Sequence, residues 1–339
     1  MIESKAFTHY YSAHCESGVI SSLLRNQGCD LSEPMVFGLS GALNFAYLPF
    51  VKVAGMPLVA YRSLPKSIIK NIEKRLHIPI KKEQFKSPLE AQKKLDELLQ
   101  QGKTVGLQTS VFYLPYFPEE MRFHFNAHNL IAYGKKAKDY LISDPVFENP
   151  VTAAPHALLK ARFAKGPFAP KGFCYYIDAI PKNLNLPEAI QKSIKKTAHM
   201  MLKTPVPIAG IRSMGLLAKR LEKLSHNRAQ QEYTRLFLGH IIRMQEEIGT
   251  GGGGFRFIYA AFLKESSTIH PAKDLLEEAA SLMTDAGDTW RNFALSAAKA
   301  SQAEAFDLLA KPAIQLRAAQ EKEKKVYALL QQLTLKPRR

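Results

Sequence analysis

Cysteine is scarce in this chain, with only Cys15, Cys29 and Cys174 among 339 residues. An odd and sparse set of this kind is not a disulfide framework, and no two of the three have metal-ligand spacing. No stretch approaches the roughly 20 apolar residues that span a bilayer, and the first residues lack the basic-then-apolar pattern of a signal peptide. These absences predict a cytoplasmic protein with no metal site and no membrane anchor.

Acidic residues are also outnumbered, because 30 Asp and Glu stand against 47 Lys and Arg, giving a net charge of +17. Such an excess predicts an acidic partner, which is a nucleic acid, a membrane surface or an acidic protein. The basic residues are scattered and no nucleic-acid-binding motif is present, so charge alone does not decide. The longest acid-free stretch, residues 151–177, is a candidate docking surface.

The apolar pattern changes near residue 183, between Pro181 and Pro187. Before this point, short strand-like runs mix with short helices, and after it helical periodicity continues to the end. With 46% hydrophobic residues, the chain is long enough for two cores. The pattern predicts an α+β domain at 1–182 and an all-α domain at 183–339.

The helical half contains a glycine-rich loop at 249–254, where five of six residues are glycine. Glycines at such density indicate backbone conformations that other side chains forbid, or a close approach to another group. The loop lacks the GK[ST] ending of a nucleotide-binding P-loop. Its amides and a following arginine are candidates to bind a phosphate or the substrate, with a simple connector as the alternative: Gly251, Gly252, Gly253, Gly254 and Arg256.

Cys15 stands at the start of an apolar helical pattern, SAHCESGVISSLLRNQG, residues 12–28. Ser12 is the expected N-cap and Gly28 the expected stop. The unpaired amides and the dipole at a helix start stabilise a thiolate, which is the reactive form of a nucleophilic cysteine. The alternative is a small core residue that takes no part in chemistry.

A base for this thiol is predicted in HNLIAYGKKAKDYLISDP, which reads as a β-hairpin. His128 and Asp144 are equidistant from Lys136, so a symmetric register places them opposite each other, with Cβ atoms about 4.5–5.5 Å apart. A carboxylate at that position holds an imidazole in one tautomer. A helical cysteine followed by a histidine and an aspartate on neighbouring strands is the papain-like order.

Three residues around Cys15 are secondary candidates for oxyanion binding or support. His9 lies six residues before the cysteine, where papain-like enzymes often carry an oxyanion donor, although a packing role explains it equally well. His14 directly precedes Cys15. Glu16 is expected to support the start of the helix.

Three segments resemble the butirosin-biosynthesis protein H family: HCESGVISSLLRNQGCDLSEPMVFGLSGALNF, HFNAHNLIAYGKKAKDYLISDP and GTGGGGFRFIYAAFLKES. The resemblance implies a papain-like acyltransferase fold with an accompanying helical domain. It also implies that Cys15 is the nucleophile, His128 the base and Asp144 the orienting acid. The acyl donor would be the phosphopantetheine thioester of an acyl carrier protein, with no bound cofactor. The acceptor would be a small amine.

Two other functions remain open on the sequence alone. The same three residues would serve a cysteine hydrolase, either a peptidase or an amidase. A basic binding protein without chemistry is the second alternative. We expect an acidic carrier protein as partner, and neither a nucleic acid nor a membrane.

Overall fold

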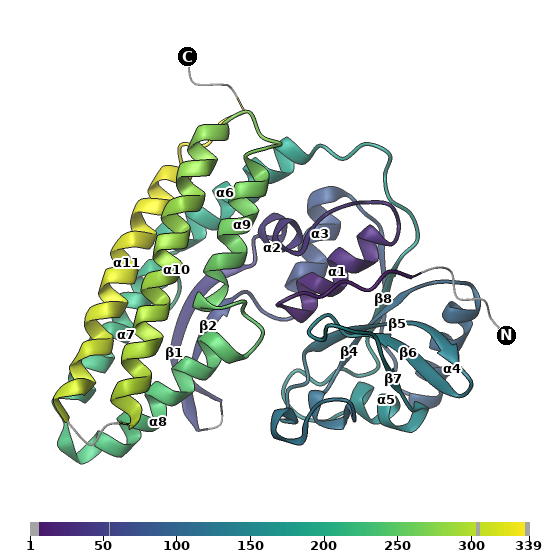
Figure 1. Cartoon of the computed structure of the whole chain (residues 1–339), viewed down its shortest axis with the longest axis horizontal. Helices are drawn as coiled ribbons and strands as arrows, with labels where there is room; N and C mark the ends of the chain where they lie inside the picture. The colour runs from purple at the N-terminus through teal and green to yellow at the C-terminus, as the bar shows by residue number, and fades with distance from the viewer. Residues whose placement is uncertain (1–6, 54, 303–305, 336–339) are drawn as a thin grey trace. The chain divides into compact units, whose positions relative to one another are not determined.

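The computed structural model describes residues 7–53, 55–302 and 306–335 (Figure 1). The chain divides into two compact units, which are described separately below. The first unit contains Met1–Val36 and Pro65–Leu184, and the second contains Phe37–Leu64 and Asn185–Arg339. The chain passes from the first unit to the second within helix α2, Glu33–Ser40.

The first unit is built on a six-stranded sheet in which all neighbouring strands are antiparallel. In spatial order its strands are β3 Ile80–Glu83, β8 Cys174–Ile177, β4 Val105–Thr109, β5 His128–Lys136, β6 Asp139–Ser143 and β7 Val151–Ala153. Every residue of β4 is buried, which fits its central place in the sheet. The sheet places β5, with the predicted base at its first residue, between β4 and β6.

Four helices and two short 3₁₀ turns complete this unit: α1 Cys15–Arg25, α3 Ser67–Leu76, α4 Pro88–Gln100, α5 Pro155–Arg162, Val111–Tyr113 and Glu119–Met121. Helix α1 is buried over nearly its whole length and contacts β4, β5 and β8. Helix α4 shows why such segments are helical: Ser87 caps its start, Pro88 occupies its first turn, and leucines at helical spacing are buried. Helix α1, by contrast, is held mainly by its burial and by its contacts with the sheet and α3.

The β5–β6 hairpin forms as predicted, but its register differs from the expected one. Lys136 pairs with Asp139, so the turn lies at residues 137–138 rather than at Lys136. An irregularity between Ala132 and Gly134 shifts the register again, so that Ile131 pairs with Ser143. Asp144, just beyond β6, therefore lies diagonally across from His128. Because strand side chains alternate with a period of two, this displacement leaves both residues on the same face.

The second unit is mostly helical, and in the described part of residues 185–339 every regular element is a helix. Its long helices are α6 Leu186–Lys203, α7 Gly210–Ser225, α8 Gln231–Ile242, α9 Arg256–Ser266, α10 Lys273–Gln302 and α11 Lys311–Leu330. Shorter helical turns lie at Arg228–Gln230, Arg243–Glu247, Gly253–Phe255 and Phe306–Ala310. Helices α10 and α11 run side by side (Figure 1). No helix in the described part of the chain is long and apolar enough to cross a membrane.

The crossing between Leu184 and Asn185 lies two residues from the predicted boundary at 182/183, but the helical unit also includes residues 37–64, which were predicted in the first domain. Strands β1, Leu43–Val53, and β2, Met56–Arg62, form a separate two-stranded sheet that belongs to the helical unit. The physical reason is aromatic packing: the rings of Phe45 and Tyr61 lie 5.5 and 5.4 Å from the Trp290 ring of α10, between centroids. Local pattern reveals that these strands exist, but not which distant helix covers them.

Candidate active site

Cys15 is the first residue of α1, as the pattern predicted, and it is 6% exposed. The N-cap is His14 rather than Ser12, because the His14 side chain accepts a hydrogen bond from the Ser17 backbone N–H. The backbone N–H of Ser12 instead donates to the carbonyl oxygen of Pro145, at 2.6 Å. This bond ties the segment before α1 to the residue that follows Asp144.

The structure brings Cys15, His128 and Asp144 together. His128 Nε2 and Asp144 Oδ2 are 2.7 Å apart, and both side chains are buried. The Cys15 thiol lies close enough to the His128 ring to contribute to the raised pKa of that ring. Since Nε2 is bound to Asp144, Nδ1 is the ring nitrogen left for the sulfur. In this arrangement an acid orients a base, and the base faces a nucleophile.

The surroundings of His128 favour its charged form. Burial lowers the pKa of His128, but the charge of Asp144, its hydrogen bond and the contact with Cys15 outweigh burial and raise this pKa from 6.5 to about 10. At neutral pH the ring is therefore an imidazolium beside the sulfur. A cation beside a cysteine sulfur is the setting that nucleophilic cysteines require.

We expect the His128 ring to titrate near pH 10 in the folded protein. Because this pKa is raised above its ordinary value of 6.5, the charged ring stabilises the fold fully below about pH 6.5, and this stabilisation is lost as pH rises through about 10. The test is an NMR titration of the histidine ring carbons, with His128→Gln to assign the signal. Asp144→Asn is expected to lower the midpoint. A midpoint near 6.5, or one indifferent to Asp144→Asn, would contradict the ion pair.

Tyr116 is a member of this site that sequence analysis missed. Its hydroxyl donates to Asp144 Oδ2 at 2.9 Å, and the Val146 N–H donates to Asp144 Oδ1 at 3.3 Å. Burial and the neighbouring Asp144 raise the pKa of Tyr116 well above its usual value, so the hydroxyl keeps its proton and remains a donor. The only sequence signal was the aromatic run YLPYF at 113–117, which is typical of any core.

His9 does not have the geometry of an oxyanion donor, so that prediction is corrected. Its Nδ1 is bound to Ser143 Oγ at 2.7 Å, and its Nε2 donates to the carbonyl oxygen of Phe147 at 2.9 Å. Both partners flank Asp144 in the sequence. His9 therefore braces the segment that carries the acid, which is a supporting role.

His14 and Glu16 support helix starts. His14 caps α1 and its Nδ1 is also bound to Ser17 Oγ at 2.8 Å. Glu16 is fully buried, and its Oε1 accepts hydrogen bonds from the N–H groups of Ile68 and Ile69, at 3.0 and 3.4 Å. A carboxylate at this place satisfies the free amides at the start of α3. Glu16 thus supports α3 rather than its own helix.

Glu33 is a second residue that the sequence did not single out. Its carboxylate accepts from the N–H groups of Ala13 and His14, at 2.9 and 2.7 Å, and from the Ser17 hydroxyl at 3.1 Å. Burial raises the pKa of Glu33, while these three hydrogen bonds oppose the rise. Glu33 fixes the residues directly before Cys15, and only the fold brings it there.

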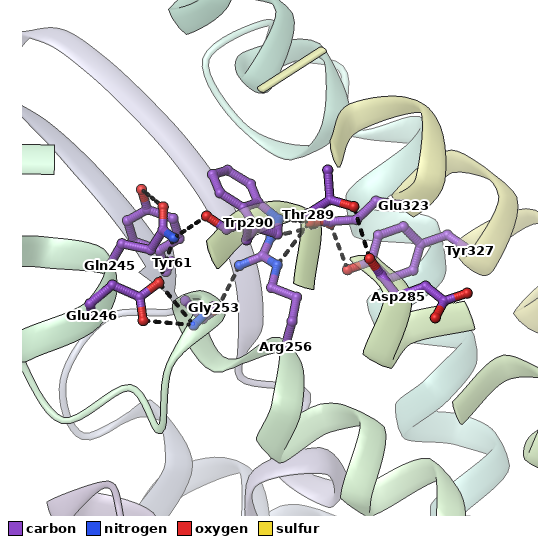
Figure 2. A network of polar contacts seen from close by, with 11 residues as sticks. Tyr61, Gln245, Glu246, Gly253, Arg256, Asp285, Thr289, Trp290, Glu323 and Tyr327 are labelled. Carbon is purple, nitrogen blue, oxygen red and sulfur yellow. Dashed lines mark hydrogen bonds and ion pairs between the residues drawn. The ribbon is translucent and has the colours of Figure 1, made fainter. Parts of the chain in front are cut away.

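Two amides of the glycine-rich loop, those of Gly252 and Gly253, are already bound to acceptors of the protein, and Figure 2 shows the contact of Gly253 with Glu246. The Gly252 N–H donates to Thr250 Oγ1 at 3.1 Å, and the Gly253 N–H lies 3.2 Å from both carboxylate oxygens of Glu246. Gly254 has φ +57°, and a Cβ there would lie 2.3 Å from Cδ1 of Tyr61. The density of glycine thus reflects backbone conformation and close packing.

Arg256 is fully buried and is bound on three sides. Its Nε and Nη2 donate to the carboxylate of Glu323, at 2.8 and 3.1 Å, and its Nη1 donates to the carbonyl oxygen of Gly254 at 2.7 Å. The predicted phosphate or substrate site is therefore corrected for Gly252, Gly253 and Arg256, whose donors are bound within the second unit, and for Gly254, which packs against Tyr61. Gly251 is exposed, and its role stays a prediction.

Comparisons with known proteins place these residues in a family context. Residues 14–145 match the family model described as "Butirosin biosynthesis protein H, N-terminal", a range that contains Cys15, His128 and Asp144. Residues 156–330 match a model described as "Domain of unknown function (DUF4872)". No curated protein matches the chain. Among solved structures, a crystal structure described as a candidate C39-like peptidase from Bacillus anthracis matches with 14% identity and a TM-score of 0.33, over 53% of this chain and 98% of that one.

Proposed function

Because this chain belongs to the butirosin biosynthesis protein H-like family, with its second C-terminal domain, we propose that it is a papain-like cysteine enzyme of secondary metabolism. More narrowly, we propose an N-acyltransferase that takes an acyl group from the phosphopantetheine thioester of an acyl carrier protein. The group passes through Cys15 to a small amine and forms an amide. The observation that carries the proposal is the chain of contacts from Cys15 through His128 to Asp144.

The first half-reaction begins from the thiolate of Cys15 and the imidazolium of His128. The thiolate attacks the thioester carbonyl carbon, and the intermediate collapses with cleavage of the bond to the pantetheine sulfur. His128 gives its proton to that departing sulfur, which leaves as a thiol. The Cys15 backbone N–H, at the first position of α1, has no acceptor within the helix and is the proposed oxyanion donor.

The second half-reaction begins from a neutral His128. In the acyl-enzyme the sulfur carries no charge, so the contribution of Cys15 to the raised pKa of His128 is lost. The ring then accepts the proton of an amine that attacks the acyl carbon. The carbon–sulfur bond breaks, and the thiolate and imidazolium are restored together. Asp144 keeps Nε2 protonated throughout, so Nδ1 remains the nitrogen that exchanges protons with sulfur and amine.

The decisive experiment measures how the acyl group is divided between amine and water. The protein is incubated with acyl carrier protein charged with a butyryl thioester and with increasing concentrations of candidate amines, and amide and free acid are quantified by mass spectrometry. We expect amide to rise and free acid to fall as the amine concentration increases. Free acid alone with every amine would instead identify a cysteine hydrolase. If neither a product nor an acyl adduct forms, the remaining alternative is a basic binding protein without catalytic activity.

A further inference from the structure

The segment between α5 and β8 presents an aromatic side chain to solvent in a strained conformation. Phe168 is 56% exposed, and its φ of +55° lies in the left-handed region that side chains other than glycine disfavour. Lys171 has φ +51°. An exposed ring gains little from packing within its own chain, so burial does not explain why an aromatic side chain occupies this position.

Two buried amide side chains fix this segment in place. Gln108 Nε2 donates to the carbonyl oxygen of Phe168 at 2.9 Å. Asn126 Nδ2 donates to the carbonyl oxygens of Lys165 and Pro167, at 3.1 and 2.9 Å. Gln108 belongs to β4, next to β5, and Asn126 lies two residues before His128. The segment is therefore anchored to the part of the sheet that carries the proposed base.

The charged residues within 165–171 are both lysines. Lys160, Lys165 and Lys171 are exposed and form no ion pair with any residue that the structure describes. Lys66, whose Nζ lies 4.0 Å from the centre of the Phe173 ring, is close enough to Lys171 to be affected by its charge. Burial and Lys171 lower the pKa of Lys66, and the charge of Glu16 opposes them. Positive charge without an internal counterion is complementary to an acidic surface.

We propose that residues 165–171, here called the docking loop, bind the acidic carrier protein that delivers the acyl thioester. Phe168 would insert into an apolar depression of the partner, and Lys165 and Lys171 would face its acidic residues. Exposed aromatic anchors supply much of the binding energy of small interfaces, while charges at the rim mainly speed association. The inference rests on the proposed function, because it assigns the surface that receives the proposed donor.

The experiment compares two donors of the same butyryl group, one on an acyl carrier protein and one on N-acetylcysteamine, which has no protein to dock. The variants are Phe168→Asn, chosen because asparagine tolerates the left-handed backbone, and the double variant Lys165→Glu/Lys171→Glu. Lys138→Glu, in the exposed β5–β6 turn, controls for charge reversal. Leu89→Ala, at a position 76% exposed on α4, controls for loss of a surface apolar group.

We expect both docking-loop variants to lower kcat/KM for the carrier-bound donor by about tenfold, the effect of losing one energetically important interface contact. The small donor should react within about twofold of wild type, and both controls should behave as wild type. The lysine variant should also lose most of the salt dependence of the carrier reaction. Equal losses with both donors, or no loss with either, would overturn the proposal.

A binding measurement separates this inference from the proposed chemistry. Fluorescence anisotropy of a labelled carrier protein is recorded against wild type and the same variants. Binding that weakens in the docking-loop variants, without any acylation of Cys15, would retain the docking surface and reject the acyltransferase. Binding that is absent in wild type, or unchanged in the variants, would reject the docking surface whatever the chemistry.

Discussion

Replacing Cys15 with alanine is expected to abolish the acyl adduct and to lower acyl transfer by at least about 1,000-fold, because the nucleophile of a triad is removed. No other cysteine can replace it. Burial and Asp30 raise the pKa of Cys29, and burial raises the pKa of Cys174 to about 11, so both stay thiols at neutral pH. Neither has a contact with His128 among those that raise its pKa.

The measurement is intact-mass spectrometry after incubation with the charged carrier protein, followed by peptide mapping. Wild type should gain the mass of one acyl group on the peptide that contains Cys15. Cys29→Ala is the matched control and should acylate normally, since this residue lies in the turn after α1 and outside the site. An adduct that persists in Cys15→Ala, or that maps to Cys29, would disprove the assigned nucleophile.

The second large effect concerns stability: Glu323→Gln is expected to lower the free energy of unfolding by about 3–5 kcal/mol. The substitution keeps the shape of the side chain but leaves the buried guanidinium of Arg256 without its countercharge (Figure 2). The same carboxylate accepts hydrogen bonds from Trp290 Nε1 and from the hydroxyl of Tyr327. Burial lowers the pKa of Arg256 and Glu323 raises it. Because an arginine pKa starts far above neutrality, the guanidinium keeps its charge when Glu323 is replaced.

Glu222→Gln offers a matched control, since Glu222 makes the same type of bidentate pair with Arg317, at 2.6 and 2.8 Å, on the surface. Exposed pairs of this kind contribute about 0–1 kcal/mol. Urea unfolding followed by tryptophan fluorescence reports directly on this region, because Trp290, the only tryptophan of the chain, is hydrogen-bonded to Glu323. Equal and small shifts for Glu323→Gln and Glu222→Gln would show that the buried pair carries no special weight.

Sequence reasoning named three residues that the structure brings together, because each has a local signature. A cysteine at a helix start and a histidine at a strand start are visible in the pattern, and the hairpin brought Asp144 near His128. The register was wrong, yet a displacement of two residues returns a strand side chain to the same face. Tyr116 and Glu33 had no such signature, because only tertiary contacts bring them to Asp144 and to the segment before Cys15.

The glycine-rich loop was misinterpreted for a related reason. A run of glycines indicates unusual backbone angles, and these are present. The anion that meets the Gly253 amide, however, is Glu246 of the same chain, seven residues away in sequence. The packing of Tyr61 against Gly254 depends on a strand far earlier in the chain. Local sequence therefore revealed the geometry of the loop but not what occupies it.

The β1–β2 hairpin has a consequence for how the protein is made. The ribosome releases Phe45 and Tyr61 long before Trp290, with the whole of Pro65–Leu184 in between. During synthesis these rings have no Trp290 to pack against, whereas the segment that follows them can already form the six-stranded sheet. Because each unit is made of two separate segments, a single cut in the polypeptide cannot separate them. In nascent chains, we expect the apolar side chains of this hairpin to need protection from aggregation until α10 has been synthesised.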